Sequence, residues 1–176
     1  MKQFSGLILA LIVAGCAYAQ QRDEDPWAKY VPGKLNDVIR ANSSGNEQQQ
    51  PGVDIAIGSA TIKARVVYAG KSRPISDDKR SLIKVWMQSN KYSEEVFQMF
   101  TEELLFREDD VAYWLPVQSV LIPQLKKEIH QRESVDLFVA WIGITFAEPG
   151  KRQHVFLVNE FEKPRQNTPT APRSRS

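Results

Sequence analysis

The amino-acid sequence predicts an α+β domain in which an antiparallel sheet or small barrel packs with about three helices. Three observations predict this class. Apolar residues follow strand patterns in four separate runs, at residues 53–69, 103–116, 135–146 and 155–161. Apolar residues with helical spacing lie between the first three of these runs. Polar segments without periodicity flank the region, so we expect a single domain at residues 53–162.

The first strand run contains a break in its alternation at Gly58-Ser59. A two-residue hairpin turn there would set Ile57 against Ala60. A β-bulge at Gly58 would instead flip the side-chain parity within one long bent strand. The sequence favours the long strand, because the run after the break is strong and the run before it is short. The side chains expected on one face after the break are Ile62, Ala64, Val66 and Tyr68.

Two helices are predicted after this strand. Ser76 is a suitable N-cap, and the acidic Asp77 and Asp78 suit the positive end of a helix dipole. The first helix should end near Ser89, and Ser93 is the expected cap of the second. The apolar side chains expected to be buried are Leu82, Ile83 and Trp86 in the first helix and Val96, Phe97 and Phe100 in the second.

A β-hairpin is predicted at residues 103–116, with its turn at Asp109-Asp110. Its register would pair Phe106 with Tyr113, Leu105 with Trp114 and Leu104 with Leu115, all favourable cross-strand partners.

The C-terminal half of the domain is predicted to hold one more helix and two strands. The helix covers about residues 118–131, and Pro123 bends it or delays its start. Residues 135–146 are apolar at both parities, which is typical of a central strand covered on both faces. Residues 155–161 form the closing strand.

The order of these elements resembles that of an OB-fold barrel, with the two-helix segment inserted after the first strand. The resemblance covers residues 53–161 and is one of element order, without a sequence motif. The alternative is a generic α+β sandwich with helices on one face of an antiparallel sheet.

The N-terminal segment predicts export. Lys2 precedes an apolar run of about 11 residues, whereas a membrane span needs roughly 20. Val13-Ala14-Gly15-Cys16 resembles a bacterial lipobox, in which residues 1–15 are removed and Cys16 is lipidated. Ala17-Tyr18-Ala19 is an alternative site for an ordinary signal peptidase, and its use would remove residues 1–19.

The two cleavage sites leave different molecules. A lipid on Cys16 would anchor the protein to a membrane, in the periplasm or at the outer membrane, whereas cleavage after Ala19 would leave a periplasmic or secreted protein. Residues 20–52 are rich in Gln, Asn, Ser and Pro and are predicted to be a flexible tether. A short helix at residues 34–40 is an alternative within it, since Leu35, Val38 and Ile39 fall on one helical face. Residues 163–176 contain four cations and no acid, which predicts a disordered basic tail.

Composition excludes several classes of function. The formal net charge of the chain is only +2, so the sequence does not have the basic field expected of a nucleic-acid-binding protein. Cys16 is the only cysteine, so the domain has no disulfide. His130 and His154 are the only histidines, and no metal or phosphate-binding motif is present. We therefore expect no metal and no cofactor.

Two sets of side chains are candidates for function. Carboxylates for a small envelope hydrolase would come from Glu103, Glu108, Asp109 and Asp110. A groove in which a ligand stacks would use Tyr113, Trp114 and Arg107. The alternative for the aromatic set is that its rings fill the core.

We expect an exported bacterial envelope protein that serves as a non-catalytic binding or accessory lipoprotein. Its expected partner is another envelope protein or a glycan, together with the membrane through Cys16. The alternatives are the envelope hydrolase and a secreted, soluble structural or binding factor.

Overall fold

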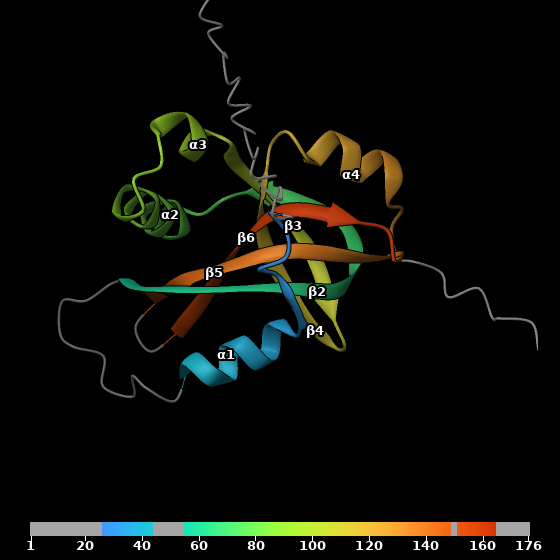
Figure 1. Cartoon of the computed structure of the whole chain (residues 1–176), viewed down its shortest axis with the longest axis horizontal. Coiled ribbons are helices and arrows are strands. Elements are labelled where there is room, and N and C mark those ends of the chain that lie inside the picture. Colours follow the sequence, from blue (N-terminus) through green and yellow to red (C-terminus); the bar gives the residue numbers. More distant parts are fainter. Residues whose placement is uncertain (1–25, 44–54, 149–150, 165–176) are drawn as a thin grey trace, which may run out of the picture.

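The computed structural model describes residues 26–43, 55–148 and 151–164 (Figure 1). These ranges contain six strands and four helices. In chain order they are β1 (Val31–Gly33), α1 (Leu35–Ser43), β2 (Ile55–Pro74), α2 (Asp77–Ser89), α3 (Glu94–Gln98), β3 (Phe100–Glu108), β4 (Val111–Gln118), α4 (Ile122–Glu128), β5 (Ser134–Glu148) and β6 (Lys151–Glu162).

Five of the strands form a closed barrel. Their order is β2-β3-β4-β6-β5, and β5 pairs with β2 to complete the circle. The β4–β6 pair is parallel at Val117 and Val158, and the other barrel pairs are antiparallel. β1 adds a short strand parallel to β2. The predicted α+β class with a small barrel is confirmed.

The first predicted strand run is one strand, β2, of 20 residues. Its register with β5 shifts between Ile57 and Ala60, so Gly58-Ser59 is a bulge and not a hairpin turn. A Cβ atom on Gly58 would lie 2.0 Å from the ring of Trp141. Glycine therefore allows a core tryptophan to pack directly against the backbone of the bulge.

The predicted hairpin is confirmed, whereas the predicted helices agree with the structure only in part. The β3–β4 hairpin has the predicted register, including Phe106 opposite Tyr113. α2 and α3 begin directly after Ser76 and Ser93, although neither serine side chain makes a capping hydrogen bond. α4 is shorter than predicted, because Gln118 still belongs to β4 and Ile129 is already extended.

The core consists of two clusters on opposite sides of β5. Val135, Leu137, Val139 and Trp141 point into the barrel. Ala140 and Ile142 point outward, where α2 and α3 cover them with Leu82, Ile83 and Phe97. β5 is thus covered on both faces, as its apolar sequence predicts.

Residues 26–43, which belong to the predicted tether, are packed on the barrel. Leu35 is completely buried in the barrel core, and Val38 and Ile39 pack against the same cluster. These three residues form the apolar face of α1, and this face closes one end of the barrel. Their burial stabilises the helix although most of the residues around them are polar. Residues 1–25, including Cys16, lie outside the described residues, as do residues 44–54 and 165–176. Among the helices that are described, none has the length and apolarity needed to cross a bilayer.

The N-terminus of α1 is held by the carboxylate of Glu108. Its two oxygens accept hydrogen bonds from the backbone N–H groups of Leu35 at 2.9 Å and Asn36 at 3.0 Å. Glu108 is only 4% exposed. A negative charge at this position also interacts favourably with the helix dipole.

Replacement of Glu108 by alanine should therefore lower the free energy of unfolding by about 2 kcal/mol, because two N–H groups lose their acceptor. Urea unfolding followed by circular dichroism measures this loss. Asp110→Ala is the matched control, since Asp110 is exposed at the tip of the same hairpin and its replacement should change stability little. Equal stability of Glu108→Ala and the native chain would show that the carboxylate does not hold α1.

Candidate functional site

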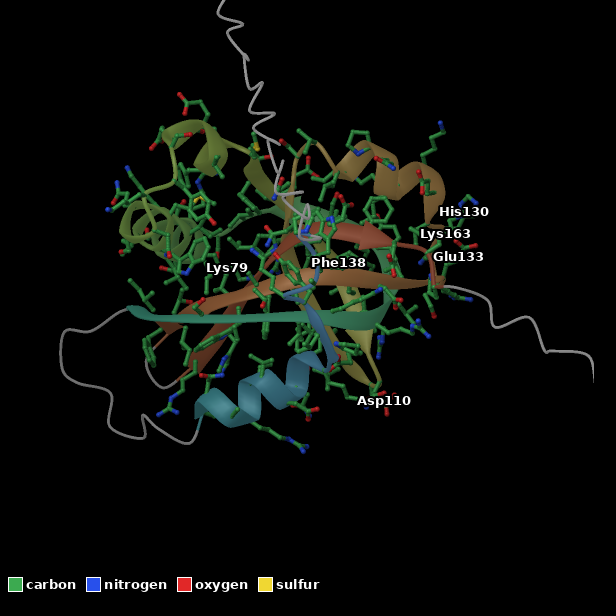
Figure 2. All side chains as sticks on the ribbon, in the orientation of Figure 1. Lys79, Asp110, His130, Glu133, Phe138 and Lys163 are labelled. Carbon is green, nitrogen blue, oxygen red and sulfur yellow. The ribbon has the colours of Figure 1, made fainter. Side chains whose placement is uncertain are left out.

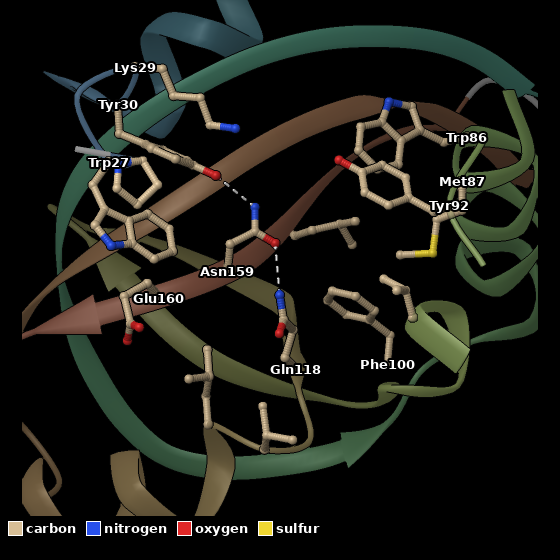
Figure 3. A pocket seen from close by; sticks show the side chains of 15 residues that line it. Trp27, Lys29, Tyr30, Trp86, Met87, Tyr92, Phe100, Gln118, Asn159 and Glu160 are labelled. Atoms are coloured by element: carbon tan, nitrogen blue, oxygen red, sulfur yellow. Dashed lines mark hydrogen bonds between the residues drawn. The ribbon is translucent and has the colours of Figure 1, made fainter. Parts of the chain in front are cut away.

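A cleft of about 490 Å³ lies on the outer surface of the barrel, between residues 26–30 and the helices α2 and α3 (Figure 3). Its volume falls within the roughly 300–1,000 Å³ of small-molecule sites. We call it the aromatic cleft and define it by the side chains of Trp27, Tyr30, Trp86, Tyr92, Gln118 and Asn159.

One wall of the aromatic cleft is a cluster of three rings. Trp27 and Tyr30 lie 5.6 Å apart between ring centroids, and both pack on Phe138 of β5, at 5.2 and 5.5 Å. The rings are tilted or edge-on, which are favourable arrangements for aromatic side chains. Phe138 points outward from the barrel, so it fixes the N-terminal segment to the sheet as one wall.

The opposite wall comes from the end of α2. The rings of Trp86 and Tyr92 stack with 5.5 Å between centroids and 21° between planes. Lys91 adopts a positive φ of 59°, and this turn carries the chain back so that Tyr92 lies beside Trp86. The indole N–H of Trp86 donates to the carbonyl of Gly58 at 3.2 Å, which fixes the ring relative to β2. Tyr92 is 49% exposed, so one face of this wall is open to solvent.

The floor between the two walls is polar. Gln118 Nε2 donates to Asn159 Oδ1 at 3.2 Å, and Asn159 Nδ2 donates to the Tyr30 hydroxyl at 3.0 Å (Figure 3). A carboxamide has two N–H donors and an acceptor oxygen. Within the described residues, one N–H of each amide is used. Both amides can therefore donate to and accept from a ligand that lies on the floor.

Among the described residues, the lining contains one cation, Lys29, and one anion, Glu160, so their ionisable side chains give it no net charge. A site that binds a polyanion gathers several cations on one surface. The aromatic cleft has the features of a site for an uncharged ligand with flat apolar faces and polar edges.

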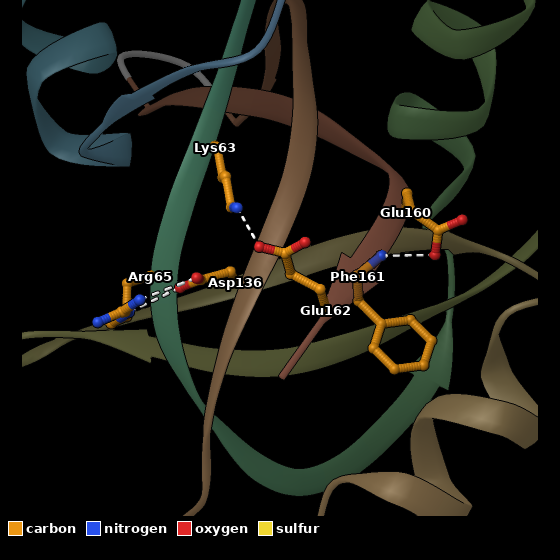
Figure 4. A network of polar contacts seen from close by, with 6 residues as sticks. All are labelled: Lys63, Arg65, Asp136, Glu160, Phe161 and Glu162. Carbon is orange, nitrogen blue, oxygen red and sulfur yellow. Dashed lines mark hydrogen bonds and ion pairs between the residues drawn. The ribbon is translucent and has the colours of Figure 1, made fainter. Parts of the chain in front are cut away.

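A second hollow, of about 550 Å³, lies beside β1 and is lined by Lys34, Lys63 and Arg65. Its cations have carboxylate partners. Arg65 donates to Asp136 at 2.7 and 2.9 Å, and Lys63 pairs with Glu162 across β5 (Figure 4). These pairs neutralise the cations that an anionic ligand would need, so the hollow is a weaker candidate than the aromatic cleft.

The binding residues predicted from sequence do not line the aromatic cleft. Tyr113 packs against the barrel core, where burial raises the pKa of its hydroxyl. Trp114 lies on the other face of β4 beneath the guanidinium of Arg73, at 4.1 Å. Arg107 is exposed near the hairpin turn. Alternation along β4 separates the two rings, so a single groove does not hold both of them.

Three of the four acidic residues proposed for hydrolysis make structural contacts through their carboxylates. Glu103 is buried in ion pairs with Lys79 and Arg73, and Glu108 holds the N-terminus of α1. Asp110 lies at the tip of the β3–β4 hairpin (Figure 2). Within the described residues, no group of three or more His, Cys, Asp or Glu side chains is arranged to hold a metal ion. These positions give the hydrolase alternative no support.

His154 forms a hydrogen-bonded chain that joins α1 to the barrel. Trp141 Nε1 lies 3.2 Å from His154 Nδ1, and His154 Nε2 lies 3.4 Å from Ser43 Oγ. Because an indole nitrogen is only a donor, Nδ1 must accept, and the proton of the neutral ring is on Nε2. Nε2 therefore donates to Ser43 and cannot act as a base toward that hydroxyl. Burial, together with the charge of Arg152, lowers the pKa of His154.

The lowered pKa of His154 predicts that acid weakens the fold. A base with a depressed folded pKa binds its proton more readily in the unfolded chain, so stability is full above pH of about 6.5 and declines as the pH falls below it. Thermal unfolding between pH 7.5 and 5.5 should show a larger loss of Tm for the native chain than for His154→Gln. Parallel pH profiles for the two proteins would contradict this assignment.

No protein family, curated protein or solved structure was found to match this chain. Its function must therefore follow from the geometry of its own residues.

The sequence contained partial signals for the aromatic cleft. Trp27 and Tyr30 form an apolar island within a polar segment, and an isolated pair of aromatic residues indicates a packing or binding role. Trp86 was expected in the core, and it packs against the outer core cluster while remaining half-buried at the cleft. Gln118 and Asn159 carry no local signal, because a single amide in a strand is ordinary and only the fold brings these two together.

Proposed function

We propose that this chain is an exported, non-catalytic binding domain of a bacterial envelope, anchored through a lipid on Cys16, and that its ligand site is the aromatic cleft. The observation that supports the site is the pair of ring walls, Trp27 with Tyr30 and Trp86 with Tyr92, on either side of an amide floor. The leader sequence supports the location.

The ligand class that this geometry favours is a neutral glycan. A sugar ring has an apolar face that can stack on an aromatic ring, and hydroxyl groups at its edge that both donate and accept hydrogen bonds. The carboxamides of Gln118 and Asn159 offer the complementary donors and acceptors. The balance of Lys29 and Glu160 supports an uncharged ligand.

We further propose that the barrel is arranged in the OB-like order. β2, β3, β4, β5 and β6 would be its five strands, with α2 and α3 in the first connection and α4 in the third. OB-folds bind oligosaccharides on the face of their second and third strands and on the first connecting loop. The aromatic cleft uses the corresponding elements, namely Phe100 of β3, Gln118 of β4 and the helical connection that carries Trp86 and Tyr92.

Binding to a panel of neutral oligosaccharides, such as oligomers of glucose and of N-acetylglucosamine, tests the ligand class. Calorimetric titration of the native chain should reveal binding, and Tyr92→Ala should weaken it about tenfold, because loss of one stacked ring costs roughly 1–3 kcal/mol. Val111→Ala is the matched control, since Val111 has 48% exposure against 49% for Tyr92 but lies on the hairpin. Absence of binding to the whole panel, or unchanged affinity of Tyr92→Ala, would refute the glycan site.

The anchor requires a separate measurement. The intact mass of the mature protein, taken from membrane and soluble fractions of its own host, should correspond to a chain that begins at acylated Cys16. A chain that begins at Gln20 in the soluble fraction would contradict the anchor and favour a secreted binding factor.

A further inference from the structure

The C-terminal tail follows β6, a strand that contributes two residues to the aromatic cleft. β6 carries Asn159 and Glu160, which line the cleft, and it ends at Glu162. The last described residue is Pro164, and residues 165–176 follow it. Five residues lead from Pro164 to Pro169, a reach of at most about 18 Å. Extended residues 165–169 are therefore long enough to lead the chain back along β6 to the cleft residues Asn159 and Glu160.

The tail contains the sequence Pro169-Thr170-Ala171-Pro172. A segment of the form P-x-x-P adopts the polyproline II conformation readily, and such segments bind grooves lined by aromatic side chains. The backbone of a polyproline II helix makes no internal hydrogen bonds, so its carbonyl groups are free to accept. The amides of Gln118 and Asn159 lie between the ring walls and can donate to those carbonyl groups.

The charges of the tail are opposite to those of three carboxylates at or beside the cleft. Beyond Pro164 the tail has three cations and no acid, at Arg165, Arg173 and Arg175. Glu160 lines the cleft, and the exposed Glu94 and Glu95 precede Val96, a lining residue, on α3. The tail would thus meet two or three carboxylates and one cation, Lys29, at the rim, while its uncharged proline segment faces the neutral floor.

We propose that residues 169–172 occupy the aromatic cleft of their own chain and compete there with its ligand. Attachment through a short linker gives the segment an effective concentration in the millimolar range, so that even a weak contact is populated. The docking stands on the cleft and the tail alone, whereas the competition rests on the proposed glycan-binding function.

The four tryptophans make the docking measurable. Trp27 and Trp86 are in the cleft, whereas Trp114 and Trp141 are outside it. Indole N–H signals in ¹⁵N-NMR spectra of the chain that begins at Gln20 should be compared with those of the same chain ending at Pro164. The truncation removes none of the described contacts. It should shift the signals of Trp27 and Trp86 and leave those of Trp114 and Trp141 in place.

A second variant separates docking from a general effect of charge. The full-length double variant Pro169→Ala/Pro172→Ala keeps every tail cation and should give the cleft signals of the truncated chain. A synthetic peptide of residues 165–176, added to the truncated chain, should return the signals toward those of the full-length protein. Identical cleft signals with and without the tail would overturn the proposal. So would a double variant that behaves as the native chain, or a shift that disappears on dilution and therefore arises between molecules.

Competition has its own readout. If the tail occupies the cleft nine-tenths of the time, truncation should tighten oligosaccharide binding about tenfold, because the apparent affinity is reduced by the fraction of open clefts. Truncation that moves the indole signals without changing this affinity would contradict competition while leaving docking intact. Absence of oligosaccharide binding in both proteins would contradict the proposed function and the competition, and the indole shifts would still decide the docking.

Discussion

Replacement of Glu103 by alanine is expected to lower the free energy of unfolding by about 3–5 kcal/mol, the range typical for breaking a buried ion pair. Glu103 is completely buried, and its two oxygens pair with Lys79 and Arg73. Lys79 lies where α2 meets the barrel (Figure 2) and is only 1% exposed. It also donates to the carbonyl of Trp114 at 3.1 Å. Lys79 therefore links α2 to β3 through Glu103 and to β4 through the Trp114 carbonyl, and Arg73 pairs with Glu103 from β2.

The expected loss arises chiefly from the charge that would remain. Burial lowers the pKa of Lys79, and the neighbouring Glu103 carboxylate opposes that effect. Without Glu103, Lys79 would have to stay buried as an uncompensated cation or release its proton. Either outcome costs free energy that the native pair avoids.

Denaturant unfolding of Glu103→Ala measures the effect. Glu102→Ala is the matched control, because Glu102 is 43% exposed and lies 3.8 Å from Lys126, so its loss should matter little. The double variant Glu103→Leu/Lys79→Met should recover most of the stability, since buried pairs are often replaceable by apolar residues of similar size. A single variant as stable as the control would show that the pair does not hold α2.

Replacement of Gly58 by alanine is the second change with a large expected effect, a loss of about 3 kcal/mol. The new methyl group would lie 2.0 Å from the ring of Trp141. That ring is 7% exposed and is held by its hydrogen bond to His154, so it has little room to move. The carbonyl of Gly58 also accepts the indole N–H of Trp86, and the same change should therefore weaken ligand binding in the cleft.

Thermal and denaturant unfolding of Gly58→Ala test the bulge. Gly33→Ala is the control, because a methyl group there would meet Ile62 at 3.3 Å, a contact that a small shift relieves. A Gly58→Ala protein with native stability would show that Trp141 does not pack against the bulge.

Elements whose partners are close in sequence were predictable. The β3–β4 hairpin follows from its turn and its cross-strand pairs, all within residues 103–116. The bulge at Gly58-Ser59 follows from a parity change that the sequence shows directly. β5 follows from apolar residues at both parities, a pattern that needs no knowledge of the covering elements.

The N-terminal segment was only partly predictable: the spacing of Leu35, Val38 and Ile39 indicates a short helix, but not its packing on the barrel. Its helix is short and polar in composition, and the carboxylate that holds its start, Glu108, is 73 residues from Leu35. Burial of Leu35 and of the Trp27 and Tyr30 rings supplies the stability that local propensity does not. The polar residues on both sides of residues 26–43 therefore led to the prediction of a tether for a segment that packs on the barrel.

The candidate site was also not predictable, because its residues are far apart in the sequence. The aromatic cleft joins residues from the N-terminal segment, α2, β4 and β6, and only the closed barrel brings them together. The carboxylates of the hairpin, by contrast, are conspicuous in the sequence because Glu108, Asp109 and Asp110 are consecutive. The structure uses Glu103 and Glu108 to hold helices, a role that sequence alone does not distinguish from catalysis.

The most direct test of the central claim, that the aromatic cleft is a glycan site, is an NMR titration of the chain that begins at Gln20 with the neutral oligosaccharide panel. The indole signals of Trp27 and Trp86 should move with increasing ligand, and those of Trp114 and Trp141 should not. A ligand that moves Trp114 and leaves the two cleft tryptophans unchanged, or a panel in which no ligand moves either of them, would contradict the account.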